Sequence, residues 1–242
     1  MGTLAGMQKS SWTGFLFKEE TLINLSKISK DERTKRAEFT CLHYKNGFEH
    51  PNCFKKKLHI KDKEVIGFLD IETTNLRADF AYVLSYCIKT QNGKLYKGLI
   101  TQQDIFSGKY DKRILKQLCK DIRRFDRVVG HYSVRFDIPF LRSRCLFWKL
   151  NFPVHKEIKH TDTYFIAKAK LLLRSRRLGV ICEFLGIPAK NHPIKPDIWM
   201  KCMYGNKKAL QYVLAHNEED VISLQRVWNR LSKYVGRNNT SI

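Results

Sequence analysis

Two acidic side chains stand at the end of a short apolar run. Asp70 and Glu72 follow residues 65–69 and are separated by one residue. Successive side chains of a β-strand point to opposite faces, so a strand here would direct both carboxylates to one face. Two acids on a buried strand are costly without a counter-charge, and a divalent cation would remove that cost. The pair indicates a metal site; the alternative is an ion pair to one acid with the other in solvent.

Two further acidic positions lie later in the chain. Asp137 stands between apolar neighbours where a strand ends and a helix is about to begin, a place that also suits a helix cap. His216 and Asp220 are four positions apart, which places both on one face of a helix. Each feature alone has an ordinary structural explanation. Together they form an ordered set: an acid pair on a first strand, an acid after a later strand, and a histidine with an acid on the final helix.

The periodicity of apolar residues predicts the elements that must position this set. Strands are expected where short runs are bounded by turn signals, at residues 64–70, 82–90, 94–101 and 127–130, with an extended segment at 154–160. Helices are expected where apolar residues recur every three or four positions, at residues 111–125, 136–148, 163–173, 177–185 and 207–234. Asp111 would cap the first helix. This order of strands and helices predicts an α/β domain with a mixed sheet.

The character of the chain changes near residue 64. We expect a basic, partly helical N-terminal segment, a region rich in Cys, His and Lys, a large domain of regular elements and a flexible tail, at residues 1–40, 41–63, 64–235 and 236–242. The 242 residues and the hydrophobic content of 43% suffice for one domain with a sizeable core plus an appendage. The whole acidic set falls within residues 64–235.

Four soft metal ligands lie close together before that domain. Cys41, His43, His50 and Cys53 fall within 13 residues, around the turn-forming pair Asn46-Gly47. Two thiolates and two imidazoles could bind one Zn²⁺ tetrahedrally, and a region this short has little core of its own. A structural zinc module is therefore expected. The alternative is that these are surface histidines and unrelated thiols.

The chain is strongly basic. Its 45 Lys and Arg residues against 23 Asp and Glu residues leave a formal net charge of +22. Such a surface suits a polyanion, and nucleic acid is the expected partner. A membrane is not expected, because no apolar stretch is long enough to span a bilayer. No signal peptide is visible and the seven cysteines are an odd number, so a cytoplasmic, intracellular protein with reduced thiols is expected.

The order of the acidic motifs resembles the DEDD superfamily of 3′ to 5′ exonucleases, which have a ribonuclease H-like fold. The resemblance covers residues 64–235 and rests on the phrases Phe-Leu-Asp-Ile-Glu-Thr-Thr-Asn-Leu, Arg-Phe-Asp-Ile-Pro-Phe-Leu and His-Asn-Glu-Glu-Asp-Val. Within the superfamily the chain is most similar to predicted exonucleases related to the proofreading domain of family B DNA polymerases. The resemblance implies a ribonuclease H-like mixed sheet flanked by helices, here with a small basic N-terminal module.

The resemblance also implies a role for each member of the set. Asp70, Glu72, Asp137 and Asp220 would hold two Mg²⁺ or Mn²⁺ ions, which prefer oxygen ligands. Two such ions can activate the attacking water and stabilise the leaving 3′ oxygen. His216 would take the proton of that water or orient it. The superfamily places a Tyr four positions before the last Asp or a His five positions before it, whereas this chain has a His four positions before.

Three activities are compatible with these features. The first is hydrolysis of DNA or RNA from a 3′ end by a two-metal exonuclease, and the second is a structure-specific ribonuclease H-like endonuclease. The third is a non-catalytic nucleic-acid-binding protein with a zinc module. Asp162 follows a predicted strand and would either cap the next helix or support the metal site. Four basic residues are expected to contact substrate phosphates: Arg135, Lys170, Arg176 and Arg177.

Overall fold

The computed structural model describes residues 28–41, 46–57, 64–188 and 193–235 of the chain. The predicted tail at 236–242 and the first 27 residues of the predicted N-terminal segment lie outside the described residues. The chain divides into two compact units, residues 1–63 and 64–242, and each is described by itself. None of the helices within the described ranges is long and apolar enough to cross a membrane.

The larger unit is built on a five-stranded mixed sheet, as predicted. Its spatial order is β3-β2-β1-β4-β5. Strand β1 pairs antiparallel with β2 on one side and parallel with β4 on the other. Strand β2 continues antiparallel to β3, and β4 continues parallel to β5. The strands are β1 (Ile66–Thr73), β2 (Val83–Thr90), β3 (Leu95–Leu99), β4 (Arg127–Gly130) and β5 (Lys159–Asp162).

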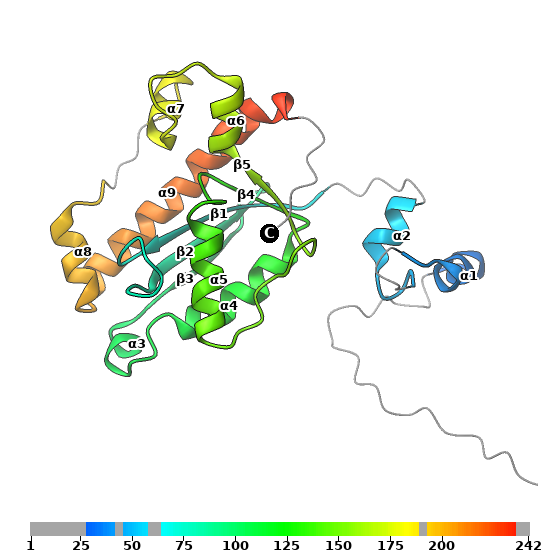
Figure 1. Cartoon of the computed structure of the whole chain (residues 1–242), viewed down its shortest axis with the longest axis horizontal. Helices are drawn as coiled ribbons and strands as arrows, with labels where there is room; N and C mark the ends of the chain where they lie inside the picture. Colours follow the sequence, from blue (N-terminus) through cyan, green and yellow to red (C-terminus); the bar gives the residue numbers. More distant parts are fainter. Residues whose placement is uncertain (1–27, 42–45, 58–63, 189–192, 236–242) are drawn as a thin grey trace, which may run out of the picture. The chain divides into compact units, whose positions relative to one another are not determined.

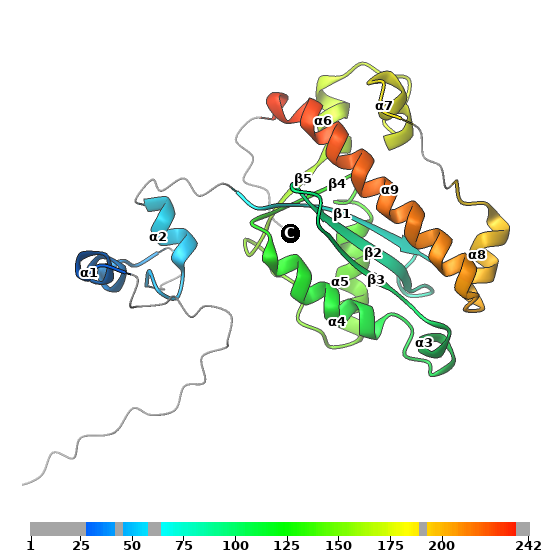
Figure 2. The ribbon, with the colours of Figure 1, turned by 180° about the vertical axis from the view of Figure 1, so that it is seen from behind.

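Helices cover both faces of this sheet (Figures 1 and 2). The long C-terminal helix packs on β1 and β2 from one face, and two earlier helices cover the other. Two short helices, the third and the eighth, were not predicted. The helices are α3 (Gln102–Phe106), α4 (Lys112–Asp121), α5 (Asp137–Phe147), α6 (Thr163–Lys170), α7 (Leu178–Phe184), α8 (Pro196–Met203) and α9 (Lys207–Leu231), with 3₁₀ turns η2 (Ile122–Arg124) and η3 (Ser232–Tyr234).

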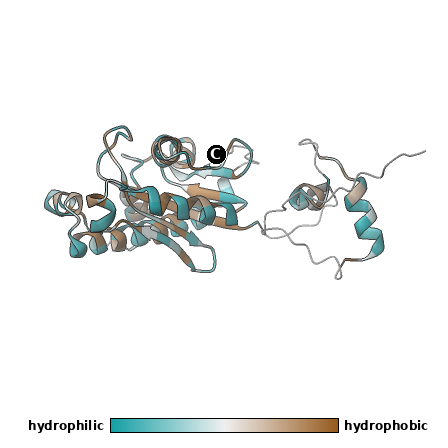
Figure 3. Ribbon diagram, turned by 90° about the horizontal axis from the view of Figure 1, so that it is seen from below, coloured by the Kyte–Doolittle hydropathy of each residue, from teal (hydrophilic) through white to brown (hydrophobic). Residues whose placement is uncertain are grey.

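The alternation of side chains along β1 decides which face receives the acids. Leu69 and Ile71 are buried in the cluster that contains the apolar side of α4 and α5. Phe68 is buried in the cluster formed with α9. Because side chains two positions apart share a face, Asp70 and Glu72 lie on the α9 side together with Phe68. In Figure 3 the strands are largely hydrophobic in colour, whereas the helices also carry hydrophilic residues. The two acids are therefore exceptions on a strand that is otherwise part of the core.

A buried ion pair joins α4 to α5. Asp111, which was predicted to cap α4, makes no side-chain cap there. Its carboxylate is fully buried and accepts hydrogen bonds from Arg144 Nε at 2.8 Å and from Trp148 Nε1 at 2.7 Å. It also accepts one from the backbone N–H of Val83 at 3.0 Å. The carboxylate thus connects helix α5 to the start of β2, a contact that spacing along the chain cannot reveal.

Replacing Arg144 by Met should lower the free energy of unfolding by about 3–5 kcal/mol, because it leaves the charge of Asp111 buried and uncompensated. Urea unfolding followed by circular dichroism would measure this loss. Arg142→Met is the matched control, since Arg142 is exposed on the same helix. Equal effects of the two substitutions would show that the buried pair contributes nothing beyond helix propensity.

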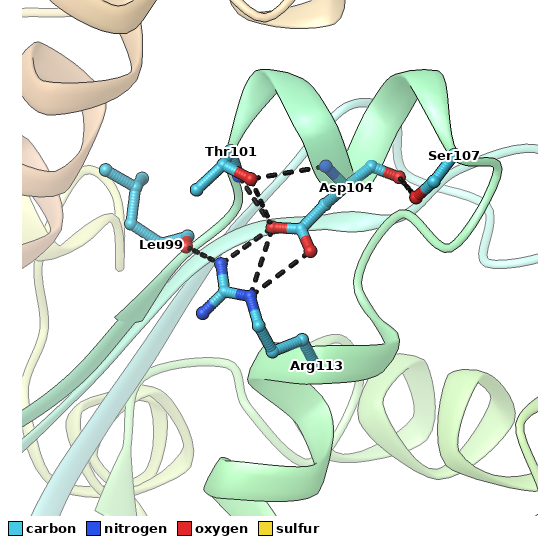
Figure 4. A network of polar contacts seen from close by, with 5 residues as sticks. All are labelled: Leu99, Thr101, Asp104, Ser107 and Arg113. Atoms are coloured by element: carbon cyan, nitrogen blue, oxygen red, sulfur yellow. Dashed lines mark hydrogen bonds and ion pairs between the residues drawn. The ribbon is translucent and has the colours of Figure 1, made fainter.

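A second network fixes the turn between β3 and α4 (Figure 4). The Thr101 side chain caps α3 by accepting from the backbone N–H of Asp104, and Asp104 Oδ2 accepts from the backbone N–H of Thr101 in return. Arg113 donates to Asp104 Oδ2 at 2.7 Å and to the carbonyl of Leu99 at 2.8 Å. Burial raises the pKa of Asp104, but the hydrogen bonds from Arg113 and Thr101 outweigh it, so this pKa lies below its usual range. The carboxylate stays ionised and fastens α3 to α4.

The smaller unit contains two short helices, α1 (Lys30–Glu38) and α2 (Pro51–Lys57). The guanidinium of Arg36 donates to the carbonyl of Gly47 at 3.2 Å and lies 4.7 Å from the ring centre of Phe54. A side chain at Gly47 would meet the Phe54 ring and the Arg36 backbone at under 3.0 Å. Phe39 and Phe54 are the buried apolar side chains among the described residues of this unit.

Candidate metal and nucleic-acid site

Helix α9 presents two polar side chains to the acids of β1. His216 Nε2 lies 3.1 Å from Asp220 Oδ2 and 3.6 Å from Glu72 Oε1. One ligand atom from each of Glu72, His216 and Asp220 lies within 4.8 Å of the other two. The side chains are only 14%, 15% and 9% exposed, so water is largely excluded from the cluster. The structure thus brings together three residues that are up to 148 positions apart in the chain.

Asp70 contacts α9 through a residue that the sequence analysis did not single out. Asn217 Nδ2 donates to Asp70 Oδ2 at 2.6 Å, and Asn217 is fully buried. Asn217 could have been recognised from its position three residues before Asp220, because this spacing places both side chains on one face of a helix. Asp70 is thus joined to the helix that carries His216, although its carboxylate is not within the three-residue cluster.

Asp137 occupies the first position of α5, and its carboxylate does not cap that helix. Asp137 Oδ1 accepts instead from the backbone N–H of Ile71 at 3.2 Å, between Asp70 and Glu72 on β1. Burial raises the pKa of Asp137 to about 7, and the charges of Asp162 and Asp220 act in the same direction. The nearby backbone N–H groups act in the opposite direction. Asp137 therefore faces β1 as an acid that gives up its proton easily only when a positive charge is near.

Asp162 caps a helix and holds a loop, which agrees with the first of its two expected roles. It is the last residue of β5 and caps α6 by accepting from the N–H of Tyr164 at 2.9 Å. It also accepts from the backbone N–H groups of Tyr132 and Val134 at 2.9 and 3.0 Å. This carboxylate fixes the loop that leads from β4 into α5, and so helps to position Asp137.

The donor set fits hard divalent cations. It consists of carboxylates and one imidazole, in a site that is mostly shielded from water, and oxygen donors are those that Mg²⁺ and Mn²⁺ prefer. Two observations support the fit: the raised pKa of Asp137 and the amide oxygen of Asn217, which is buried without a hydrogen-bond partner among the described residues. The neighbouring acid Glu218 is engaged elsewhere, because it accepts from Lys97 at 2.6 Å. Cations would thus be held by Asp70, Glu72, Asp137 and Asp220.

A basic and aromatic pocket opens where β4 and β5 end. Its volume is about 530 Å³, and its lining includes Tyr132, Tyr164 and the guanidinium groups of Arg174, Arg176 and Arg177. Arg176 Nε is buried and has no hydrogen-bond partner within the described part of the chain. The two tyrosine rings meet edge to face with centroids 4.8 Å apart. None of the lining residues belongs to the acidic set, but the backbone N–H groups of both tyrosines donate to Asp162, whose charge also acts on Asp137.

Two of the four predicted phosphate-contacting residues line this pocket and two do not. Arg176 and Arg177 belong to its wall. Arg135 is exposed in the loop before α5, and Lys170 is exposed at the end of α6. The pocket itself could not be predicted, because its lining combines Tyr132 with Arg174, which lies 42 residues later in the chain.

The smaller unit contains the predicted cluster of soft ligands in part. Cys41 Sγ lies 3.4 Å and Cys53 Sγ 4.0 Å from His50 Nδ1. Their ligand atoms all lie within 4.8 Å of one another. His43, the predicted fourth ligand, lies outside the described residues. Two thiols and one imidazole at such distances fit a Zn²⁺ ion that a fourth ligand would complete.

We expect the purified protein to contain about one equivalent of zinc, because two thiols and one imidazole converge in this unit. Cys53→Ser should remove the metal and the ordered fold of this unit while leaving residues 64–235 folded. Mass spectrometry would measure the zinc content of wild type and of Cys53→Ser, and proton NMR would show which unit remains folded. Cys182→Ser, which changes a buried thiol of the larger unit, is the control. A protein that folds without zinc would rule out the structural metal.

The fold and the carboxylate set define a ribonuclease H-like α/β domain. The profile of the family RNase_H_2, described as RNase_H superfamily, matches residues 67–232, and the chain belongs to this family. The solved structure of the family B DNA polymerase from the hyperthermophilic archaeon Pyrobaculum calidifontis is similar, with a TM-score of 0.60 and 17% sequence identity. The match covers 72% of this chain but only 25% of the polymerase chain. At that identity the likeness shows a shared fold. A comparison with curated proteins finds no match.

Proposed function

We propose that the chain is a metal-dependent nuclease that removes nucleotides from the 3′ end of DNA or RNA. The observation that carries this proposal is the convergence of Glu72, His216 and Asp220. Asp70 lies on the same strand β1, and Asp137 of α5 accepts a hydrogen bond from the β1 backbone. When bound by these carboxylates, two cations would activate a water molecule and stabilise the leaving oxygen. The likeness to a DNA polymerase fold and the charge of +22 support a nucleic-acid substrate.

The position of His216 supports a role in moving the proton of the attacking water. Its Nε2 faces the oxygens of Glu72 and Asp220. Ionised carboxylates only accept hydrogen bonds, so this nitrogen carries a hydrogen while both acids face it. With cations held by the acids, the neutral tautomer that carries its hydrogen on Nδ1 could accept the proton of the attacking water at Nε2, which would leave an imidazolium and a hydroxide nucleophile. The spacing of four residues, unusual for the resembled superfamily, gives the imidazole direct reach to Asp220 along one helix face.

The pocket lined by tyrosines and arginines would supply contacts for a strand of nucleic acid. Guanidinium groups bind phosphate oxygens in pairs, and Arg176 has a buried donor that no described residue satisfies. Tyrosine rings provide surfaces on which unpaired bases stack. Tyr132 is 44% exposed at this place, so its ring is accessible to a base. The pocket supports the binding of a single strand whose end reaches the acids.

The decisive experiment uses end-labelled single-stranded and duplex DNA and RNA with Mg²⁺, Mn²⁺ or a chelator. The proposal predicts a ladder of single-nucleotide steps from the 3′ end that the chelator abolishes. Discrete internal cuts would instead indicate an endonuclease, and binding without cleavage would indicate a non-catalytic protein. His216→Ala should lower the rate by about 10²- to 10⁴-fold at saturating metal, the range for removal of a general base. Near-full activity of this variant would remove the role of His216.

A further inference from the structure

Asn217 is a polar side chain inside the core, between β1 and α9. It is 0% exposed, and its amide nitrogen donates to Asp70 Oδ2 at 2.6 Å. The amide oxygen is also buried and has no partner among the described residues. Burying an amide oxygen without a hydrogen-bond partner lowers the stability of the folded state. The packing of α9 on the sheet does not require this cost, because the neighbouring contacts of α9 with β1 and β2 are made by apolar residues such as Leu214 and Val221.

The orientation of the amide follows from its partner. An ionised carboxylate can only accept, so the NH₂ group must face Asp70 and the oxygen must face away from it. The bond is made to Oδ2 and fixes the carboxylate of Asp70 from the helix side. Partners of this kind orient metal-binding side chains in other proteins. Mg²⁺ also keeps several waters, which are hydrogen-bond donors of the type that the Asn217 oxygen lacks.

We propose that Asn217 is a positioning residue, which holds Asp70 in the rotamer that binds a divalent cation. This inference rests on the proposed function, since it assigns the cation to the same site. His216, Asn217 and Asp220 share one face of α9, so one helix would supply a proton-accepting group, an orienting amide and a ligand. In this arrangement the position of α9 against β1 determines the affinity of the site for the metal. Asn217 itself does not bind the metal.

The test is a calorimetric titration of the full chain with Mn²⁺, combined with a double-mutant cycle. Asn217→Ala should weaken Mn²⁺ binding by about 10- to 100-fold. Asn217→Leu, which preserves side-chain volume, should do the same if the alanine variant is poorly folded. Asn229→Ala changes an exposed residue of the same helix and should bind Mn²⁺ like the wild type. Nuclease activity of the two Asn217 variants should return to within a few-fold of wild type when Mn²⁺ saturates the site.

The cycle separates this role from a general effect on α9. In an Asp70→Asn background, a further Asn217→Ala change should leave the remaining Mn²⁺ affinity unaltered, because its partner is already lost. An equal loss in both backgrounds, or unchanged or tighter Mn²⁺ binding by Asn217→Ala alone, would overturn the inference. A wild-type protein that binds no Mn²⁺ would instead overturn the proposed function, so the two failures are distinct.

Discussion

Asp220→Asn should lower the rate of metal-dependent cleavage by at least about a thousandfold, while Glu218→Gln should leave it nearly unchanged. Both substitutions remove one negative charge from the same helix within two positions of each other. Asp220 is buried beside His216, at 3.1 Å. Glu218 is turned toward Lys97 on β3. The contrast follows from the helical step of about 100° per residue, which separates the two side chains onto different faces.

Steady-state kinetics at several Mg²⁺ concentrations would measure this difference. An amide in place of the Asp220 carboxylate retains the shape but supplies a weaker ligand and no charge to offset the cation. Added metal should therefore not restore full activity. Circular dichroism would show that both variants keep the fold. If Glu218→Gln lost as much activity as Asp220→Asn, the site would have to be placed on the other face of α9.

Asp137→Asn should abolish cleavage and at the same time stabilise the metal-free protein. The pKa of Asp137 is raised from 3.8 to about 7 by burial and by the charges of Asp162 and Asp220. Each unit of such a shift corresponds to about 1.4 kcal/mol. The folded state binds the proton more tightly than the unfolded state, so the metal-free protein loses stability as the pH rises from about 4 to about 7. Asparagine is neutral at every pH and can still accept from the Ile71 N–H, so it removes this loss.

Chemical unfolding in a chelator from pH 4 to pH 8 would measure the effect. The advantage of Asp137→Asn over wild type should be near zero at pH 4 and reach a few kcal/mol at pH 8. Mg²⁺ should reverse the order, because a cation that binds the folded wild type stabilises it. Asp79→Asn removes an exposed charge and should show neither effect. A less stable Asp137→Asn protein in chelator at pH 8 would show that this carboxylate is not under electrostatic strain.

Much of the fold could be predicted from local pattern. The strand that carries Asp70 and Glu72 was predicted from its apolar run, and the alternation of side chains placed both acids on one face. The mixed sheet and the long C-terminal helix were predicted from the order of strands and helices and from the helical spacing of apolar residues, and both are present. Boundaries were less certain: β5 begins at Lys159, five residues after the predicted start, because its register is set by pairing with β4.

Other features depended on contacts that no local pattern records. Asp111 was expected to cap α4 but is bound by Arg144, which lies 33 positions later. Asp137 could have been a helix cap, yet its carboxylate accepts from the backbone of β1. Asn217 was not predicted as a site residue, although its amide donates to Asp70. In each case the partner is distant in sequence, and side-chain type alone does not reveal it.

The sequence by itself determined most of the elements, the strand face on which Asp70 and Glu72 lie and the charge that favours a nucleic-acid partner. The elements and their faces follow from the spacing of side chains along a strand or a helix, which is local. The net charge follows from composition, which is a sum over residues. Only the tertiary structure decided which acids meet, which are engaged elsewhere and which polar side chain holds Asp70. Those outcomes depend on how α9 and α5 pack against β1, since burial and charge proximity arise only after segments distant in the chain come together.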